Sequence, residues 1–295
     1  MKALEAVEQF LVEQQLRNNS PATVEAYRSI LTLWLGKANI EDLTQVNRES
    51  LSRWRLGLQQ RQLSAATVKT YVKHVRIFCS WAVRAGLMKT NPMLDLPPVR
   101  VPAGTGEYVT FSKEDVQKML KVASRERRPT RLRDVAIIAT LLDSGMRAGE
   151  LASIHLPQVS WGERTMLVSG KTGRREVPVL TCLRHVRRYV ERERRASPGE
   201  QALFTTRFSV PMRSKTVTHL VRTLAADAQV GATKTGPHTF RHTFAVEYLR
   251  SGGDVFSLMR ILGHRELETT QRYVHWLMPD LSAAHARHSP ANRWL

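Results

Sequence analysis

Residues 89–106 interrupt the chain with a run of helix-breaking residues. The stretch contains four prolines and two glycines, namely Pro92, Pro97, Pro98, Pro102, Gly104 and Gly106. Proline fixes φ and lacks the backbone N–H that a continuing helix or a central strand needs. We therefore expect a semi-extended linker here. The 295 residues are enough for two domains with separate cores, which we place at residues 1–88 and 107–295.

Residues 1–88 have the periodicity of helices throughout. Ser20-Pro21 has the features of a helix start, with serine as the N-cap and proline at the first helical position. Apolar residues then recur at helical spacing: Val24, Tyr27, Leu31, Trp34 and Leu35. A second helix is expected after Ser64, with an apolar stripe made of Val68, Tyr71, Val72, Val75 and Phe78. These patterns predict a small helical bundle.

Four basic residues, Lys69, Lys73, Arg76 and Arg84, fall on the side of this second helix that is opposite its apolar stripe. They form either an ordinary solvated helix face or a row that lies along the phosphates of a nucleic acid. The whole chain has 45 basic and 26 acidic residues, a net charge of +19, and both halves share the excess. This balance favours a polyanionic partner, but composition alone does not distinguish DNA from RNA.

The part of the chain after the linker has a mixed pattern. Residues 131–142 are apolar at helical spacing. Residues 165–168 and 176–179 have the composition of short strands, and they flank a glycine-bounded turn at 170–173. Further helices are expected around residues 181–195, 213–229, 238–251, 254–262 and 266–274. The predicted fold class is therefore mainly α, with a small antiparallel β-sheet in the second domain.

Several classes of protein are disfavoured by simple features of the sequence. No apolar run approaches the roughly 18 residues of a membrane span, and the N-terminus lacks the apolar core of a signal peptide. Cys79 and Cys182 match no metal or redox spacing, so we expect buried free thiols. No paired carboxylates have a spacing suited to a divalent ion. We expect a cytoplasmic protein with no metal and no cofactor.

A histidine followed three residues later by an arginine occurs at three places in the chain: His185/Arg188, His219/Arg222 and His238/Arg241. With ten histidines in the sequence this spacing arises by chance, so alone it carries no weight. The third pair stands in the run P-H-T-F-R-H-T-F-A at residues 237–245. Leu262-Gly263-His264 follows, and Tyr273 lies nine residues after that histidine.

These boxes resemble the signatures of the tyrosine recombinase (phage integrase) family. The run at 237–245 is similar to H-x-L-R-H-[ST]-F-A, and His264 and Tyr273 match the L-G-H and Y elements. Residues 142–151, with Arg147 and Glu150, resemble the T-G-L-R-x-x-E-L box. Residues 169–179, with Lys171, resemble the G-K-G-x-K-x-R-x-V-P-L hairpin, although Thr172 stands where many members have glycine.

The resemblance implies roles for individual residues. The catalytic set would be Arg147, Lys171, His238, Arg241, His264 and Tyr273. Tyr273 would be the nucleophile, and Lys171 the general acid that protonates the departing 5′ oxygen. Glu150 would orient its neighbours, and Arg174 and Arg175 would contact the DNA backbone. Residues 1–88 would be the SAM-like core-binding domain of the family.

This set fits the chemistry of attack on a phosphodiester. The attack builds negative charge on phosphorus, which planar cations such as Arg147 and Arg241 stabilise, and His264 could donate a further hydrogen bond. A free tyrosine has a pKa of about 10, so only about one in a thousand is ionised at pH 7. Something must therefore take the proton of Tyr273 or lower its pKa, and His238 and the arginines are the candidates.

The implied activity is that of a site-specific recombinase, either Xer-like or transposon-encoded. It would cleave and rejoin DNA through a covalent 3′-phosphotyrosine and exchange strands through a Holliday junction. The partner would be double-stranded DNA that carries a specific recombination site. On this DNA the protein would form a homotetramer, whereas the free protein would be a monomer or a weak dimer. Residues 279–293 would dock on a neighbouring subunit or fold back in cis. The alternatives are a type IB topoisomerase and a non-cleaving DNA-binding regulator. The expected location is the cytoplasm, in association with the nucleoid.

Overall fold

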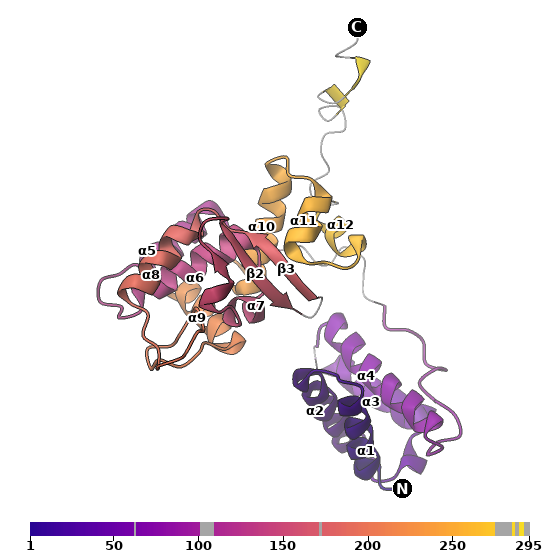
Figure 1. Ribbon diagram of the computed structural model, residues 1–295. Coiled ribbons are helices and arrows are strands. Elements are labelled where there is room, and N and C mark those ends of the chain that lie inside the picture. The colour runs from indigo at the N-terminus through magenta and orange to yellow at the C-terminus, as the bar shows by residue number, and fades with distance from the viewer. Residues whose placement is uncertain (62, 101–108, 171–172, 275–284, 287–288, 292–295) are drawn as a thin grey trace. The chain divides into compact units, whose positions relative to one another are not determined.

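The structure is a computed structural model that describes residues 1–61, 63–100, 109–170, 173–274, 285–286 and 289–291. The chain divides into two compact units, Met1–Glu107 and Tyr108–Leu295, each with its own hydrophobic core (Figure 1). The described residues are mostly helical and contain one small antiparallel sheet. No helix in this part of the chain is long and apolar enough to cross a membrane.

The first unit is a bundle of four helices: α1 (Ala3–Leu16), α2 (Pro21–Ala38), α3 (Arg48–Gln60) and α4 (Ala65–Arg84), with a short 3₁₀ turn η1 (Leu43–Gln45) before α3. The two helix starts expected from the sequence are confirmed. Ser20 caps α2 by accepting a hydrogen bond from the backbone N–H of Thr23, and Ser64 caps α4 in the same way through Thr67. Each cap satisfies a backbone donor that the first turn of a helix leaves unpaired.

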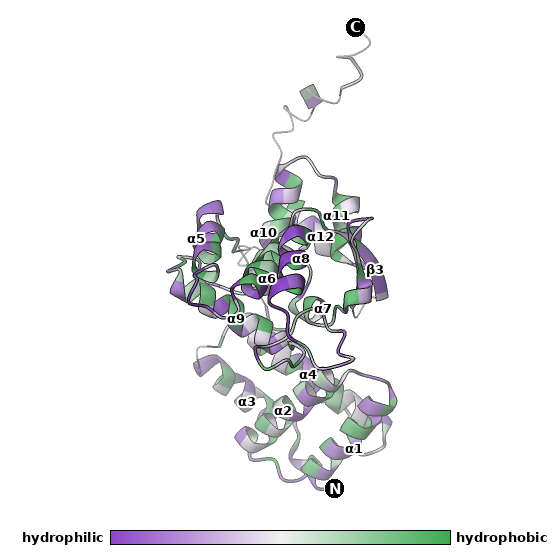
Figure 2. Cartoon of the chain, turned by 60° about the vertical axis from the view of Figure 1, so that its left-hand side comes forward, coloured by the Kyte–Doolittle hydropathy of each residue, from purple (hydrophilic) through white to green (hydrophobic). Residues whose placement is uncertain are grey.

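Aromatic side chains fill the centre of this bundle. Phe78 is fully buried, and its ring centroid lies 5.6 Å from that of Phe10 and 5.8 Å from that of Trp34. Figure 2 shows hydrophobic and hydrophilic residues on different sides of these helices. Lys69, Lys73 and Arg84 are exposed on α4, as the amphipathic pattern predicts, while Arg76 is half-buried and donates to the carbonyl of Met93.

The first half of the expected linker packs against the first unit and is not a free connecting segment. Met93 and Leu96 are buried and belong to the core of the first unit. Asn91 is also buried, and its amide donates to the Ser80 hydroxyl at 2.7 Å. The prolines rule out a helix here, but they do not stop neighbouring apolar side chains from packing. Residues 101–106 of the expected linker lie outside the described residues.

The second unit contains eight described helices and a three-stranded sheet. The longer helices are α5 (Lys113–Ala123), α6 (Arg131–Ser144), α8 (Cys182–Arg192), α9 (Ser214–Asp227) and α10 (Pro237–Arg250). The shorter ones are α7 (Ala148–Ala152), α11 (Val255–Leu262) and α12 (Leu267–Val274), with a 3₁₀ turn η2 at Leu156–Gln158. The strands β1 (Val159–Ser160), β2 (Thr165–Gly170) and β3 (Gly173–Pro178) pair antiparallel in that order.

The predicted hairpin is confirmed, with Gly170 opposite Gly173 at its closed end. The third strand, β1, was not expected, because two residues are too short to show an alternating pattern. Helix α6 lies at the centre of the unit, where α5, α8 and α10 pack against it. Cys79 in the first unit and Cys182 here are both buried free thiols, as predicted, and burial raises the pKa of Cys79 to about 12.

Helix α6 ends at Ser144, with Gly145 as its C-cap. Gly145 has φ of 59°, in the left-handed region that favours glycine. A Cβ atom added there would lie 2.5 Å from Cδ1 of Phe244 on α10. The glycine therefore allows the chain to turn sharply while α10 packs close behind it. This turn delivers Arg147 to the start of α7.

A small separate core joins the last three helices. Its buried members are Ala245, Val246, Leu258, Leu262 and Tyr273, from α10, α11 and α12. Helices α11 and α12 pack on each other and on α10 (Figure 1). Tyr273 is thereby held against α10 rather than projecting into solvent.

The aromatic core of the first unit gives a test of the fold. Because Phe78 is fully buried between other rings, Phe78→Ala should lower the free energy of unfolding by about 3–5 kcal/mol. Urea unfolding followed by tryptophan fluorescence measures this change. The matched control is Arg53→Ala, because the ion pair of Arg53 with Glu49 has side chains 79% and 80% exposed, so its loss should cost at most about 1 kcal/mol. Equal losses in the two variants would contradict the assignment of Phe78 to the core.

Candidate active site

The carboxylate of Glu150, on α7, is the centre of a buried network of charges. It is 4% exposed and accepts hydrogen bonds from the backbone N–H of Arg147 at 2.9 Å and from Nη1 of Arg147 at 2.8 Å. It also accepts from both terminal nitrogens of Arg175, on β3, at 3.0 and 2.9 Å. Arg175 in turn donates to the carbonyl of Ile261 at 2.8 Å. One carboxylate thus connects α7, the hairpin and the end of α11.

The same contacts keep Glu150 ionised. Burial raises the pKa of a carboxyl group, but the hydrogen bonds from Arg175 and Arg147 and the positive charge of Arg175 outweigh it. The net result is a pKa of about 2. Glu150 therefore carries its negative charge at neutral pH and holds Arg147, while the orienting role implied for it stays a prediction.

The hairpin approaches this carboxylate very closely. A Cβ atom on Gly170, at the end of β2, would lie 2.6 Å from Oε1 of Glu150. Only a residue without a side chain fits this position while Glu150 keeps its place. The next residue, Lys171, lies outside the described residues, so its predicted role as general acid remains a prediction.

Arg174 and Arg175 are neighbours on β3 but face opposite sides, because successive side chains of a strand alternate. Arg174 is exposed, in keeping with its predicted contact with a DNA backbone. The side chain of Arg175 is 13% exposed and is engaged with Glu150 and Ile261. This arrangement favours a structural role for Arg175 over the DNA contact that the sequence predicts.

Arg241, on α10, is 3% exposed and is held by backbone carbonyls. It donates from Nη1 to the carbonyl of Gly145 at 2.9 Å and from Nη2 to that of Leu262 at 2.8 Å. Burial, followed by the charge of Arg147, lowers the pKa of Arg241 to about 10, so it stays positively charged at neutral pH. A guanidinium has five N–H groups, so these bonds do not exhaust its donors.

His264 contacts Arg241 rather than standing apart from it. Its Nε2 lies 2.8 Å from Nη2 of Arg241, and its Nδ1 lies 2.8 Å from the hydroxyl of Thr270. Because arginine can only donate, Nε2 is the acceptor, which leaves the ring proton on Nδ1 to face Thr270. Burial, followed by nearby arginines, lowers the pKa of His264 to about 4, in keeping with this neutral form. In the structure His264 accepts a hydrogen bond from Arg241, and its predicted hydrogen bond to a phosphate stays a prediction.

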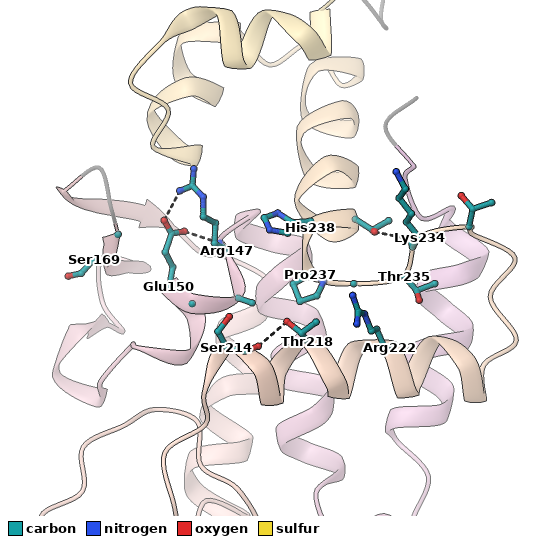
Figure 3. Close-up of a pocket in the computed structure, with 16 residues that line it drawn as sticks. Arg147, Glu150, Ser169, Ser214, Thr218, Arg222, Lys234, Thr235, Pro237 and His238 are labelled. Atoms are coloured by element: carbon teal, nitrogen blue, oxygen red, sulfur yellow. Dashed lines mark hydrogen bonds and ion pairs between the residues drawn. The ribbon is translucent and has the colours of Figure 1, made fainter. Parts of the chain in front are cut away.

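His238 stands at the first turn of α10, on the wall of a cavity of about 890 Å³. Arg147 and Glu150 line the same cavity from the α7 side (Figure 3). Gly170 of the hairpin lines it as well. Burial of part of its ring, followed by the charges of Arg241 and Arg147, lowers the pKa of His238. His238 is therefore neutral at pH 7. Its ring donates one hydrogen bond from the nitrogen that carries the proton and accepts one at the other nitrogen.

The opposite wall of the cavity holds cations that the sequence analysis did not single out as functional. Arg222 lies on α9, and Lys234 and Thr235 lie in the loop before α10 (Figure 3). Arg222 belongs to the second H-x-x-R spacing, which occurs too often by chance to be selected on its own. A cavity with arginines, a lysine and a histidine on its walls suits an anion of the size of a phosphodiester.

Tyr273 reaches a partner that the sequence analysis missed. Its hydroxyl lies 2.9 Å from Nδ1 of His242, on α10. His242 belongs to the R-H-T-F run directly after Arg241, so a signal existed, but its spacing gave no indication of a role. Burial, followed by His238, Arg241 and Lys234, lowers the pKa of His242 to about 4. The ring is therefore neutral, and its Nδ1 shares a hydrogen bond with the phenol.

The described residues contain no group of three or more histidine, cysteine, aspartate or glutamate side chains that could hold a metal ion. The site that they form consists instead of fixed cations, neutral histidines and a buried tyrosine. Of the residues predicted to act together, Arg147, Glu150 and His238 line one cavity. Arg241 joins them through the carbonyl of Gly145, two residues before Arg147.

Comparisons with known proteins identify the family of the chain. The chain matches the family model described as "Phage integrase family" over residues 110–278, and "Phage integrase, N-terminal SAM-like domain" over residues 7–86. It is 28% identical to the tyrosine recombinase XerC of Lactobacillus leichmannii, covering 93% of this chain and 95% of the relative. It is 30% identical to the tyrosine recombinase XerD of Ralstonia nicotianae, covering 97% and 94%.

The fold is also that of a solved structure. A Tn1549 transposon integrase in complex with transposon right-end DNA has a TM-score of 0.77 and 18% identity, over 92% of this chain and 94% of that one. The chain therefore belongs to the phage integrase family, the tyrosine recombinases. It is an enzyme that breaks and rejoins DNA, with homologues among the Xer recombinases.

The depressed pKa of Glu150 predicts a pH dependence of stability. The pKa is 4.5 for an unperturbed glutamate and about 2 in the folded protein. Because the folded state binds its proton more weakly, the contribution of Glu150 is complete above pH 4.5 and is lost as the pH falls towards 2. Its pH-dependent part is on the order of 3 kcal/mol. The difference in unfolding free energy between wild type and Glu150→Gln should therefore shrink from pH 7 to pH 3 in urea titrations.

Glu247→Gln is the matched control for this measurement. Glu247 pairs with Arg250 on the exposed side of α10, where the two side chains are 56% and 58% exposed. Water screens such a pair, so its loss should cost at most about 1 kcal/mol. A Glu150→Gln difference that stays constant between pH 7 and pH 3 would contradict the buried ionised carboxylate.

Proposed function

We propose that this protein is a site-specific DNA recombinase that cleaves through a covalent 3′-phosphotyrosine on Tyr273. The observation that carries this proposal is the joint fixing of Arg147 and Arg241, which lie far apart in the sequence. Arg241 binds the carbonyl of Gly145, and Arg147 is held two residues later by Glu150. Two cations held beside one cavity suit a phosphate that gains negative charge during the reaction.

The reaction follows from the chemistry of these groups. The hydroxyl oxygen of Tyr273 attacks phosphorus, and the bond between phosphorus and the 5′ oxygen breaks. The phenol proton passes to a neutral histidine, and the departing 5′ oxygen receives a proton from Lys171. Arg147 and Arg241 stabilise the charge on the non-bridging oxygens. Because the phosphotyrosine conserves the energy of the phosphodiester, a 5′-hydroxyl from a second strand can reverse the step without ATP.

Double-stranded DNA is the proposed partner, held through its backbone as well as at the cleavage site. The exposed residues Lys69, Lys73 and Arg84 of α4 and Arg174 of β3 support this proposal, since backbone phosphates are the usual contacts of such cations. Arg76 is a weaker member of the set, because it is half-buried and already donates to Met93. Arg222 and Lys234 extend the same basic surface into the cavity.

Strand exchange through a Holliday junction requires four active sites, and a homotetramer on DNA supplies them. We infer that the free protein is a monomer or weak dimer and assembles on its recombination site, in the cytoplasm and in association with the nucleoid. Most of the tail expected to dock between subunits, residues 279–293, lies outside the described residues. Its docking in trans or in cis remains a prediction.

The nucleophile can be tested by removing one oxygen atom. Nicked suicide duplexes, selected from random sequences by binding to the protein, should trap wild type as a covalent protein–DNA adduct on a denaturing gel. Tyr273→Phe lacks the attacking oxygen and should form no adduct. Tyr248→Phe, a matched change on α10, should form one. No adduct with wild type, or an adduct with Tyr273→Phe, would contradict the proposal.

The same duplexes distinguish recombination from relaxation. A recombinase joins the cleaved strand to a second duplex, which gives a product of new length on the gel. A type IB topoisomerase with the same chemistry would relax supercoiled plasmid without that product. A non-cleaving regulator would bind and give neither.

The role of Lys171 is tested with a substrate whose leaving group needs no proton. Lys171→Ala should cleave ordinary DNA about 10²–10⁴ times more slowly than wild type, the usual range for loss of a general acid. With sulfur in place of the bridging 5′ oxygen, the variant should cleave at a rate close to that of wild type. Arg174→Ala, a neighbouring cation on the hairpin, should slow both substrates equally. Failure of sulfur to restore Lys171→Ala would exclude the general-acid role.

A further inference from the structure

The hydroxyl of Tyr273 is held inside the protein, and Tyr273 does not line the cavity beside Arg147 and His238. Tyr273 is 3% exposed, and its hydroxyl lies 2.9 Å from Nδ1 of His242. The two rings come from α12 and α10, with centroids 5.8 Å apart. Packing of Tyr273 against Ala245 and Leu258 keeps the phenol in this place. The hydrogen bond is thus part of the core that joins the last three helices.

The direction of this hydrogen bond follows from the protonation of its two partners. A phenol keeps its proton at neutral pH. His242 is neutral because burial, then His238, Arg241 and Lys234, lower its pKa. A neutral imidazole carries its proton on one nitrogen, and with that proton on Nε2 the Nδ1 atom accepts from the hydroxyl of Tyr273. In this tautomer the phenol proton points at a base, and the lone pairs of the phenol oxygen point away from His242.

His238, the base that the sequence suggests, occupies a different place. It lies one turn before His242 on α10, on the wall of the cavity beside Arg147. A ring in that place is suited to contact the phosphate itself. Of the two histidines in the H-T-F-R-H run, His238 thus lies beside the proposed phosphate position and His242 contacts the proposed nucleophile.

We propose that His242, and not His238, is the general base that accepts the proton of Tyr273 during cleavage, which deepens the proposed function and rests on it. As the bond between the tyrosine oxygen and phosphorus forms, the O–H bond breaks and its proton moves to Nδ1. The bond between phosphorus and the 5′ oxygen breaks at the same time, its electron pair goes to the 5′ oxygen, and this oxygen takes a proton from Lys171. Rejoining returns the proton from His242 to the phenol.

Binding of DNA should raise the affinity of His242 for a proton. The positive charges that face His242 are Arg241 on its own helix and Lys234 in the preceding loop, with His238 and the phenol of Tyr273 as its other titratable neighbours. A phosphate held by Arg147 and Arg241 offsets part of this positive charge. The affinity of His242 for a proton therefore rises when the substrate is in place.

Three variants of the full-length protein test this assignment by single-turnover cleavage of the suicide duplex between pH 7 and 9. His242→Leu removes the base and should slow cleavage about 10²–10⁴-fold at pH 7. Its rate should then rise about tenfold per pH unit, because the phenolate must form without help. His242→Asn keeps a hydrogen-bond acceptor near Nδ1 but cannot take up a proton, so it should show the same rise with pH.

His238→Asn is the comparison that separates the two histidines. It should slow cleavage through loss of a phosphate contact, and its rate should not recover at high pH. A purely structural effect of the His242 substitutions would slow cleavage equally at every pH. Such a uniform loss, an unchanged or faster rate in His242→Leu, or a recovery at high pH in His238→Asn instead would overturn the proposal.

The hydrogen bond itself can be measured without DNA, which separates this proposal from the proposed function. In ¹⁵N NMR spectra of the free protein, Nδ1 of His242 should be unprotonated and should shift when Tyr273→Phe removes its donor. If wild type forms no adduct, the recombinase function fails whatever this spectrum shows. If the adduct forms but Nδ1 is protonated or insensitive to Tyr273→Phe, only the assignment of His242 fails.

Discussion

The buried carboxylate of Glu150 is the interaction on which the geometry of the site depends. Burying a carboxylate is unfavourable unless charged and hydrogen-bonding partners replace the lost water. Here Arg147 and Arg175 supply those partners, and each is fixed in return. Because Arg175 belongs to β3 and also binds Ile261 at the end of α11, one charge network sets the positions of α7, the hairpin and the helix before His264.

The cations of the site are in place before any DNA is present. Arg241 is anchored by the carbonyls of Gly145 and Leu262, and the neutral ring of His264 orients it further. A site whose donors are already fixed has little reorganisation to carry out when charge develops on the phosphate. The proposed nucleophile, Tyr273, is also held in place, because its hydroxyl shares a hydrogen bond with His242 inside a packed core. Membership of the phage integrase family and this geometry agree on the breaking and rejoining of DNA.

Local sequence signals predicted the helices and the hairpin, but they did not predict which side chains from distant parts of the chain contact one another. Ser20 and Ser64 mark helix starts through the chemistry of single residues, and the structure places both as expected. The inward direction of Arg175 and the packing of Met93 in the first core depend on residues distant in the chain. The pairing of Tyr273 with His242 is of this second kind, since it requires α12 to pack on α10. The sequence motifs identified which residues lie close together, and the fold determines which atoms each of them contacts.

We propose that Arg147 and Arg241 hold one phosphate while the hydroxyl of Tyr273 stays beside His242. The most direct measurement is a crystal structure of Tyr273→Phe bound to its recombination site. The account predicts that non-bridging oxygens of the scissile phosphate accept hydrogen bonds from both arginines, with the pair of Glu150 and Arg175 intact and the ring of residue 273 next to His242. A scissile phosphate beyond hydrogen-bonding distance of both arginines would contradict it.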